Sequence, residues 1–348
     1  MALGLSVKPK LLIVELWGLG DLVIASPFIQ AAVEKYAVTL LAKPFAQEMR
    51  PRLWPGVKVV SFTAPWTAFR FGAKYSLWRW PWPGMLRVIR QLQAEQFACA
   101  VSGRWDPRDH FILQATSARK RLGFPRWKSG CCLTQPLARP TPLAHRCEYW
   151  RVIASALGME LPPRSKFFPT SRTLPPVILI HSGARLPLRV WPLQKFQAIA
   201  RRLRQENYEV QIACDEDQAD WWHHQGEQAQ SPRTVGELFA CLDRAGLFIG
   251  NDSGSGHLAA SCGLPTLTLF GPQLHEWFTP LHPAAEWIEG KACPYKPCSD
   301  YCRYATPDCL WKVDVEEVWP QVQAFARRHL RASNSLVNDK TILGLLKT

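Results

Sequence analysis

Apolar and polar positions in the first half of the chain follow two spacings. Lys10–Leu16 is a mostly apolar run of the kind that forms a buried strand, and Asp21–Tyr36 has apolar residues at helical spacing. Both patterns recur, with strands expected at Val38–Ala42, Val57–Phe62 and Phe97–Ser102 and helices at Gly84–Gln96, Asp109–Ser117 and His145–Leu157. Strands that alternate with helices predict a parallel sheet built from right-handed βαβ units.

The pattern restarts after a proline-rich, irregular stretch between residues 161 and 176. The elements expected in the second half are strands at Val177–His181, Tyr208–Cys214, Leu247–Ile249 and Thr266–Phe270, and helices at Leu193–Gln205, Thr234–Asp243, Gly256–Cys262 and Val315–Leu330. The sequence therefore predicts an α/β protein with two domains, residues 1–170 and 176–330, joined by a linker. We expect the last helix to pack back onto the N-terminal domain. Residues 331–348 form a weakly specified tail.

The composition is that of a globular chain, with 348 residues, 47% hydrophobic and 20% charged. The net charge of +14 favours anionic partners such as nucleotide phosphates, a phosphorylated glycolipid, an anionic membrane or nucleic acid. Much of the excess lies between Arg70 and Lys128, where twelve Lys or Arg residues stand against three acids. We expect neither a secretory signal nor a membrane span, and the odd number of cysteines, 11, favours reduced thiols in a cytoplasm.

The run 250–265 is the most informative stretch of the sequence. A polar, glycine-rich turn there lies between a strand and a short helix, which places Ser253, Gly254 and His257 near a helix N-terminus. Unpaired backbone N–H groups and the helix dipole make such a position an anion site, and serine hydroxyls can add donors. A well-capped joint between strand and helix that binds no ligand is the alternative.

The motif Asp-Ser-Gly-x-x-His-Leu-Ala-Ala at 252–260, followed by Gly-x-Pro at 263–265 and Leu-Phe-Gly-Pro at 269–272, resembles the donor-binding signature of the heptosyltransferase family, glycosyltransferase family 9. The resemblance implies a GT-B fold, in which two Rossmann-like domains with parallel sheets face each other across a cleft. It also implies donor-binding roles for Asp252, Ser253, Gly254 and His257. The family usually has an apolar pair where this chain has Ser255 and Gly256.

A second glycine-rich motif, Gly-Leu-Gly-Asp at 18–21, directly follows the first predicted strand. A dinucleotide fingerprint would need glycine where Val23 stands, and the sequence has no P-loop, so both of these nucleotide motifs are excluded. Asp21 by itself could simply be a charge in a first helical turn. The motif, with Pro27 in the following helix, resembles the Gly-Asp motif of the family. The resemblance implies that Asp21 is the general base that takes a proton from an acceptor hydroxyl.

A third polar patch, His181–Arg185, again lies after a strand and before a helix, and Arg189-Val-Trp-Pro follows it. The family usually shows a Gly-Ala-type turn and a Lys/Arg-x-Trp-Pro sequence at these places. The resemblance therefore implies that Gly183 and Arg189 contact the donor, with the arginine at the nucleotide phosphates. Arginine is a bidentate partner for phosphate oxygens. A surface arginine ahead of a helix is the alternative.

Aromatic and basic residues are interleaved between Trp54 and Trp82, where nine aromatics fall within 29 residues. Such a stretch can stack on sugars, lie at a bilayer interface, contact nucleic acid, or fold into the core. We favour a surface that faces a glycolipid or a membrane, because the same domain carries Asp21. The acceptor-binding candidates are arginines near predicted strand ends or in a basic stretch common in the family: Arg104, Arg108, Arg119 and Arg121.

Four cysteines, Cys293, Cys298, Cys302 and Cys309, lie within 17 residues. Four thiols suit a tetrahedral structural zinc by their number, although their spacing is not that of paired CxxC motifs. Reduced thiols or redox pairing are the alternatives, and none of the three makes the cluster catalytic. We expect no cofactor to be required for the chemistry.

The sequence thus predicts an inverting glycosyltransferase that transfers a sugar to a lipopolysaccharide-core-like glycolipid. The resemblance implies heptose from ADP-heptose as the donor. The expected partners are the nucleotide-sugar, the glycolipid and an anionic membrane surface, with no nucleic acid, and the expected location is cytoplasmic, at the inner face of the membrane. The alternatives are a family member with another nucleotide-sugar or glycan acceptor, and a non-catalytic protein of the same fold that binds an anionic ligand or nucleic acid.

Overall fold

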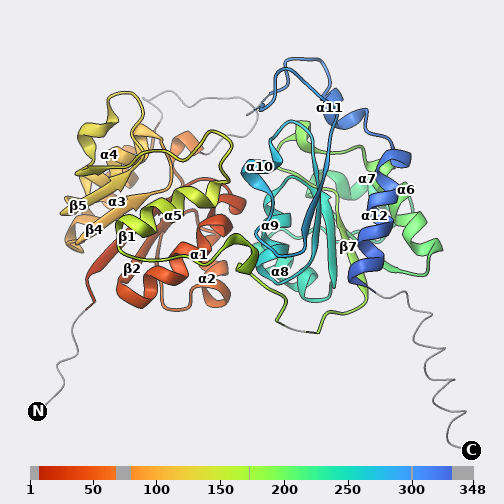
Figure 1. The fold of residues 1–348 in the computed structure, drawn as a ribbon, viewed down its shortest axis with the longest axis horizontal. Helices are drawn as coiled ribbons and strands as arrows, with labels where there is room; N and C mark the ends of the chain where they lie inside the picture. Colours follow the sequence, from red (N-terminus) through yellow and green to blue (C-terminus); the bar gives the residue numbers. More distant parts are fainter. Residues whose placement is uncertain (1–7, 68–79, 172, 299–300, 331–348) are drawn as a thin grey trace, which may run out of the picture. The chain divides into compact units, whose positions relative to one another are not determined.

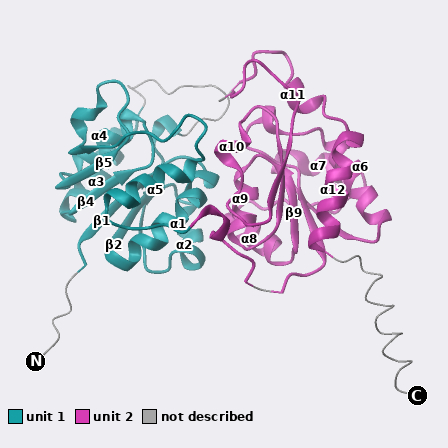
Figure 2. Ribbon diagram, viewed as in Figure 1, with its two compact units in different colours: residues 1–162 teal, residues 163–348 magenta. Residues whose placement is uncertain are grey.

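The computed structural model describes residues 8–67, 80–171, 173–298 and 301–330. The chain divides into two compact units, residues 1–162 (unit 1) and 163–348 (unit 2), shown in Figure 2. Each unit is a sheet flanked by helices (Figure 1). The division falls at Pro162, within the proline-rich stretch.

Unit 1 is built on a six-stranded sheet with the order β3-β2-β1-β4-β5-β6. Its strands are β1 (Lys10–Glu15), β2 (Ala37–Ala42), β3 (Lys58–Ser61), β4 (Cys99–Ser102), β5 (Lys120–Gly123) and β6 (Gln135–Pro136). Its helices are α1 (Leu19–Lys35), α2 (Ala46–Leu53), α3 (Trp82–Ala94), α4 (Pro107–Ala115) and α5 (Arg146–Ala156), with short 3-10 turns η1 (Pro65–Thr67) and η3 (Ser129–Cys132). Helices α1 and α5 pack side by side (Figure 1).

Unit 2 is built on a five-stranded sheet with the order β11-β10-β9-β7-β8. Its strands are β7 (Val177–His181), β8 (Glu209–Ala213), β9 (Leu247–Asn251), β10 (Thr266–Phe270) and β11 (Ala285–Glu289). Its helices are α6 (Leu193–Gln205), α7 (Ala219–His224), α8 (Val235–Asp243), α9 (Gly254–Ser261), α10 (His275–Phe278), α11 (Asp308–Trp311) and α12 (Val315–His329), with 3-10 turns that include η4 (Arg164–Lys166), η5 (Pro187–Arg189) and η6 (Glu216–Gln218).

Every strand pairing among the described residues is parallel. The central strands are covered on both faces, and the side chains of Leu11–Val14 in β1 and Ile178–Ile180 in β7 are inaccessible to solvent. This burial explains why these strands read as nearly continuous apolar runs rather than as alternating ones. The α/β class with two Rossmann-like domains, predicted from the sequence, is confirmed.

The prediction for the last helix was wrong. Helix α12 packs against α6 within unit 2 (Figure 1), and its buried side chains Val318, Val322 and Phe325 belong to the core that also holds Ile180 and Leu203. The apolar stripe of an amphipathic helix does not say which core it covers, so the sequence could not assign it. The predicted tail, 331–348, lies outside the described residues.

The aromatic stretch between Trp54 and Trp82 does not behave as one surface. Trp54 and Trp66 are buried in the core of unit 1, which is the alternative reading of this stretch. Trp82 is exposed at the start of α3, and residues 68–79 lie outside the described part of the chain. Within the described residues, no helix is both long enough and apolar enough to cross a bilayer.

Gly246, between α8 and β9, shows how closely the backbone packs in unit 2. A Cβ at this position would lie 1.9 Å from the carbonyl oxygen of Pro175, whereas a Cβ at Gly84 in α3 meets nothing within 4 Å. We expect Gly246→Ala to lower the free energy of unfolding by about 1–3 kcal/mol, because the backbone must move. Gly84→Ala, the control, should leave it unchanged or raise it by up to about 1 kcal/mol. Urea denaturation of both variants tests this, and equal stabilities would contradict it.

Candidate functional site

Asp21 occupies the first turn of α1, directly beyond the carboxyl end of β1. The helix begins at Leu19 with Gly18 as its N-cap, two residues earlier than the sequence predicted. The Gly18 N–H donates to Asp21 Oδ2 at 2.9 Å, and the guanidinium of Arg104 forms an ion pair with Asp21 Oδ1. Both carboxylate oxygens therefore accept a donor that favours the charged form, which is the form a general base needs.

Arg104 is held firmly where it follows β4. Its backbone N–H donates to Ser102 Oγ at 3.2 Å, and its carbonyl oxygen is hydrogen-bonded to His110 Nε2 at 3.1 Å. The guanidinium lies over the ring of Trp17, 5.1 Å from the centroid. A side chain fixed in this way loses little entropy when it pairs with Asp21.

Two further buried acids lie around Arg104. Glu15 Oε2 lies 3.9 Å from Arg104 Nε, and Asp109 is fully buried with Oδ2 accepting from Ser102 Oγ at 3.3 Å. Burial raises the pKa of Glu15 to about 8, partly offset by Arg104, and raises the pKa of Asp109 to about 7. At neutral pH Glu15 is therefore mainly protonated, so it does not compete strongly with Asp21 for the guanidinium charge.

A small pocket opens beside Asp21 within unit 1. Its lining comprises Glu15, Asp21, Ile24, Gly103, Arg104, Trp105, Arg146 and Trp150. The Arg146 guanidinium lies 4.3 Å from the centroid of the Trp105 ring. Burial and the neighbouring Arg104 lower the pKa of Arg146 to about 10, so it remains a cation at neutral pH. Two cations, a carboxylate and indole faces suit a polar ligand that carries negative charge and hydroxyl groups.

Glycine is required at one wall of this pocket. A Cβ on Gly103 would lie 2.6 Å from the indole of Trp150, closer than any ordinary contact. Trp150 in turn stacks on Phe28 of α1, with ring centroids 5.1 Å apart. The turn after β4 can therefore approach α5 only without a side chain at 103, and this approach places Arg104 beside Asp21.

Of the four predicted acceptor arginines, only Arg104 lines the pocket. Arg108 is bound to Asp106, with the Nε–Oδ1 hydrogen bond at 2.9 Å. Arg121 donates to two backbone carbonyls, those of Cys132 and Ala118, each at 2.8 Å, and so braces the end of β5. The acceptor-binding roles of Arg108, Arg119 and Arg121 stay predictions.

The raised pKa of Glu15 predicts a pH-dependent stability. The group is protonated in the folded protein up to about pH 8 but ionises at lower pH when unfolded, so the wild type loses stability as pH rises from about 4.5 to 8. In Glu15→Gln this loss is absent. We expect the free energy of unfolding of the variant, relative to wild type, to rise by more than about 1 kcal/mol between pH 5 and pH 8.

Urea denaturation at several pH values measures this difference. Glu95→Gln is the control, because hydrogen bonds from Lys10 and Lys58 lower the pKa of Glu95 to about 2. Its stabilising effect is present above the unfolded pKa and is lost only as pH falls. A Glu15→Gln curve parallel to wild type over this range would refute the buried, protonated state.

The turn after β7 in unit 2 is shaped by a half-buried acid, Asp215. Gly183 N–H donates to His181 Nδ1 at 3.2 Å, and a Cβ on Gly183 would lie 2.2 Å from Asp215 Oδ1. Glycine is thus the residue that lets this turn close over Asp215. Gly183, predicted as a donor-binding residue, lies in a backbone turn at the carboxyl edge of the sheet, where ligands of parallel sheets bind.

Asn251, at the end of β9, ties two loops together. Its Nδ2 donates to the carbonyl oxygen of Ser182 at 2.8 Å, and its Oδ1 accepts from the backbone N–H of Trp191 at 3.0 Å. The side chain is fully buried. This amide therefore fixes the turn after β7 and the segment that carries Arg189 in one arrangement.

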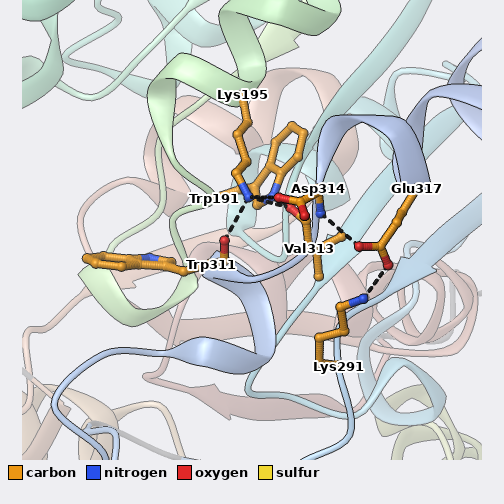
Figure 3. Close-up of polar contacts among 7 residues, drawn as sticks. All are labelled: Trp191, Lys195, Lys291, Trp311, Val313, Asp314 and Glu317. Atoms are coloured by element: carbon orange, nitrogen blue, oxygen red, sulfur yellow. Dashed lines mark hydrogen bonds and ion pairs between the residues drawn. The ribbon is translucent and has the colours of Figure 1, made fainter.

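The segment that follows Arg189 is anchored a second time. The indole Nε1 of Trp191 donates to the carbonyl oxygen of Val313 at 3.0 Å (Figure 3). Lys195 Nζ donates to the carbonyls of Trp311 and Val313 and to Asp314 Oδ1, each at 2.8 Å (Figure 3). The start of α6 is in this way fastened to the segment between α11 and α12.

Arg189 reaches the motif at 252–257 through an ion pair. Its Nη1 lies 3.1 Å from Oδ2 of the buried Asp252, and the Asp252 backbone N–H donates to the Leu269 carbonyl oxygen at 3.0 Å. Ser253 is the N-cap of α9 and Gly254 its first residue. The structure thus brings the predicted cation next to the predicted helix N-terminus, and the Asp252 side chain orients the arginine.

The remaining residues of this motif are arranged by α9. The hydroxyls of Ser253 and Ser255 are hydrogen-bonded at 2.6 Å, and His257 is buried in the first part of the helix. Gly256 lies beside Phe248 and Thr268, where a Cβ would make only ordinary contacts. The unusual Ser255-Gly256 pair therefore fits the helix without distortion.

We expect removal of the Asn251 amide to lower the free energy of unfolding. Asn251→Ala would leave the Trp191 N–H buried without its partner, at about 1–3 kcal/mol, and would leave the Ser182 carbonyl only the longer hydrogen bond from Gln218 Nε2 at 3.4 Å. We expect a decrease of at least about 2 kcal/mol in the free energy of unfolding by urea. Gln93→Ala, which removes an exposed amide bonded to the Ala115 carbonyl, is the control and should cost less than about 1 kcal/mol. A decrease in the free energy of unfolding of Asn251→Ala no larger than that of the control would argue against a stabilising role for the Asn251 hydrogen bonds.

The predicted zinc site is not formed by the described residues. Cys298 Sγ donates to the Tyr295 carbonyl and Cys302 Sγ donates to the Thr306 carbonyl, so these sulfurs point at separate backbone groups. Burial raises the pKa of the Cys309 thiol to about 11. Cys293 is likewise a free thiol, and the described residues contain no group of three or more His, Cys, Asp or Glu side chains placed to hold a metal ion.

Sequence reasoning missed three residues that shape these sites. Glu15 and Asn251 are polar residues at the ends of otherwise apolar strands, a signal that could have drawn attention to them. Arg146 gave no comparable signal, because it lies more than 100 residues from Asp21 in the sequence and only the packing of α5 against α1 brings them together.

Comparison with known proteins finds similarity in the second half of the chain. Residues 151–306 match the model of glycosyltransferase family 9 (heptosyltransferase). The chain is 32% identical over 113 residues to lipopolysaccharide heptosyltransferase 3 of Escherichia coli, an alignment that covers 30% of this chain and 33% of that protein. The alignment thus spans about a third of the length of this curated relative.

Solved structures extend the similarity of fold to nearly the whole chain. The structure of E. coli ADP-heptose LPS heptosyltransferase II matches with a TM-score of 0.68 and 14% identity, covering 92% of this chain and 99% of that one. The E. coli heptosyltransferase WaaC with ADP-2-deoxy-2-fluoro heptose matches with a TM-score of 0.67 and 13% identity, covering 90% and 99%. At these identities the match shows the fold alone, and it is the GT-B fold predicted from the sequence.

The resemblance on which the sequence analysis relied is therefore confirmed. The match to the family model spans residues 151–306 and includes every predicted donor-binding residue, from Gly183 to His257. Asp21 and Arg104 lie before it. The predicted cleft and the roles of the individual residues stay predictions.

Proposed function

We propose that this protein is an inverting glycosyltransferase that transfers a sugar from a nucleotide-sugar to a glycolipid acceptor. The observation that carries the proposal is the family match over 151–306, because it covers the ion pair of Arg189 with Asp252 and the N-terminus of α9. A fixed cation beside a helix N-terminus is an arrangement that binds phosphate groups. The donor we propose is ADP-heptose, and the acceptor is a glycolipid of the lipopolysaccharide core.

The proposed roles in unit 2 concern the leaving group. Arg189, Ser253, Gly254 and His257 hold the diphosphate, and Gly183 lets the turn after β7 approach the donor. As the bond between the anomeric carbon and the β-phosphate oxygen breaks, negative charge builds on the diphosphate. Arg189 and the backbone N–H groups at the start of α9 stabilise this charge. Asp252 keeps the arginine oriented through the ion pair described above.

The proposed roles in unit 1 concern the acceptor. The acceptor binds over the small pocket beside Asp21, where Arg104 and Arg146 attract its carboxylate or phosphate groups and the indole of Trp105 faces its sugar ring. Asp21 accepts the proton of the attacking hydroxyl. The Gly18 N–H and the Arg104 guanidinium hold the carboxylate in position, and each of its oxygens keeps a second lone pair for that proton.

The reaction is a single displacement. The acceptor oxygen forms a bond to the anomeric carbon while the bond to the diphosphate breaks and the hydroxyl proton passes to Asp21. One in-line displacement inverts the configuration at the anomeric carbon. No covalent enzyme intermediate is formed, and the side chains named above supply the general base and the charge stabilisation.

Two substitutions separate the proposed roles. Asp21→Asn keeps the shape and the acceptor for the Gly18 N–H but removes the base, and we expect kcat to fall by about 10²–10⁴-fold with nucleotide affinity unchanged. Arg189→Ala removes the phosphate cation, and we expect the Kd for ADP to rise about 10- to 100-fold. Calorimetry with ADP and a transfer assay with ADP-heptose and lipid extracts measure the two effects.

The matched control is Glu48→Gln, an exposed acid in the first turn of α2. It should change neither quantity. Unchanged turnover in Asp21→Asn would remove the base from the mechanism. If the Kd for ADP were the same in Arg189→Ala as in the wild type, Arg189 would not be part of a phosphate site in unit 2.

A further inference from the structure

The ionisable side chains that line the pocket beside Asp21 can give it two different net charges. They are two acids, Asp21 and Glu15, and two cations, Arg104 and Arg146. If both acids were ionised, each guanidinium would be matched by a carboxylate and the lining would be neutral overall. If one acid keeps its proton, the lining carries one surplus positive charge. The charge of the pocket therefore depends on the state of the two acids.

The surroundings of the two acids decide which one is ionised. The Asp21 side chain is 21% exposed, and it accepts hydrogen bonds from the Gly18 N–H and the Arg104 guanidinium. The Glu15 side chain is only 2% exposed. Its Oε1 accepts the Trp17 backbone N–H at 3.2 Å, and its Oε2 lies 3.9 Å from Arg104 Nε, which is longer than a hydrogen bond. Solvent and close donors thus favour a charge on Asp21, and burial disfavours one on Glu15.

A third acid near Arg104 strengthens this preference. Asp109 of α4 is fully buried, and three carboxyl groups that share one guanidinium cannot all be ionised at low cost. Burial raises the pKa of Glu15 to about 8; the charge of Arg104 lowers it, and the charges of Asp21 and Asp109 raise it. Strand β2 places the neutral Ala42 at the register of Glu15. The charged groups that act on Glu15 therefore come from α1, α4 and the turn after β4.

We propose that Glu15 is a specificity-determining residue of this pocket, which it lines as a neutral carboxylic acid, so that one surplus cation selects a ligand group with negative charge. The ligand class is a sugar that carries an anionic group on its ring. A neutral carboxylic acid also has an O–H donor, which a carboxylate lacks. Two guanidinium groups and this donor are then available to the anionic group, and the indole of Trp105 to the sugar ring.

The proposal makes the charge selectivity of the pocket depend on pH. Glu15 is neutral below about pH 8 and ionised above it, so the lining changes from cationic to neutral overall. Arg104 stays charged throughout, and Arg146, whose pKa burial and Arg104 lower to about 10, keeps its charge over the same range. An anionic ligand should therefore bind less tightly as pH rises from 7 to 9, because Glu15 must take up a proton for the tighter binding.

This inference rests on the proposed function for the identity of the ligand as the acceptor, and it names the residue that selects the charge of that acceptor. Binding is measured without donor or turnover. Loss of the proposed transfer activity would leave the binding result standing. Binding that does not depend on Glu15 would leave the proposed role of Asp21 as general base untouched, so the two failures are distinguishable.

The experiment is a titration of the full chain with glucose 6-sulfate, followed by saturation-transfer NMR at pH 7, 8 and 9. The sulfate group keeps its charge over this range, and glucose is the uncharged control ligand. For the wild type we expect the Kd for glucose 6-sulfate to rise about fivefold or more from pH 7 to pH 9. Glu15→Gln keeps the shape of the neutral acid and cannot ionise. Its Kd should equal that of the wild type at pH 7 and rise about twofold or less by pH 9.

Two acids outside the pocket lining provide the matched controls. Glu48→Gln removes an exposed acid of α2 and should show the same rise in Kd as the wild type. Asp109→Asn removes the other buried acid close to Arg104 and should keep most of the rise, because Glu15 still ionises. Equal melting temperatures at pH 7 confirm that the variants fold, and the wild-type pH series needs no variant.

Four results would overturn the inference. The first is a wild-type chain that does not bind glucose 6-sulfate at pH 7, or binds glucose as tightly. The second is a wild-type Kd for glucose 6-sulfate that is the same at pH 7 and pH 9. The third is a rise in Kd that is as large in Glu15→Gln as in the wild type, or that is lost equally in Asp109→Asn. The fourth is binding that Arg189→Ala abolishes and Arg104→Gln leaves intact, because the anion would then lie in unit 2.

Discussion

The ion pair between Asp21 and Arg104 is the interaction on which the chemistry of unit 1 depends. A carboxylate at a helix N-terminus is common, but here it is held at both oxygens and lies next to a second guanidinium, that of Arg146. The charges of Asp21 and Arg104 balance each other because burial raises the pKa of Glu15 to about 8 and so favours its neutral form. If Glu15 were ionised, it would compete for the same cation, and the charge on Asp21 would be less well compensated.

In unit 2 the segment that carries the cation Arg189 is held by neutral side chains. Arg189 is oriented by its ion pair with Asp252, and the buried groups that fix the backbone around it are the amide of Asn251 and the indole of Trp191, both neutral. Neutral buried hydrogen bonds carry no titration and little salt dependence, so the loop keeps its shape when a charged ligand arrives. In both units the polar residues lie at the carboxyl ends of parallel strands, the edge at which this architecture leaves room for ligands.

Much of the fold followed from the sequence. The strand Val177–His181 and the helix Leu193–Gln205 have the predicted bounds, because strong apolar periodicity and clear flanking residues specify such elements locally. Short elements such as β11 and α2 were not predicted, since their apolar content is low and neighbouring strands or helices stabilise them. Helix α12 was correctly predicted to be helical from its amphipathic stripe. The domain that it packs on was predicted wrongly, because the stripe does not specify which core it covers.

The sequence by itself determined the alternation of strands and helices, the α/β class, the family resemblance of 252–272 and the position of Asp21 at a helix start. These are local properties, because they depend only on residue spacing and on motifs of fewer than 25 residues. Only the tertiary structure decided that Arg104, and not Arg108 or Arg121, meets Asp21, that Arg146 joins them, and that Trp54 and Trp66 belong to the core. Such pairings depend on how helices pack across a sheet, because van der Waals packing and burial act between residues that are distant along the chain.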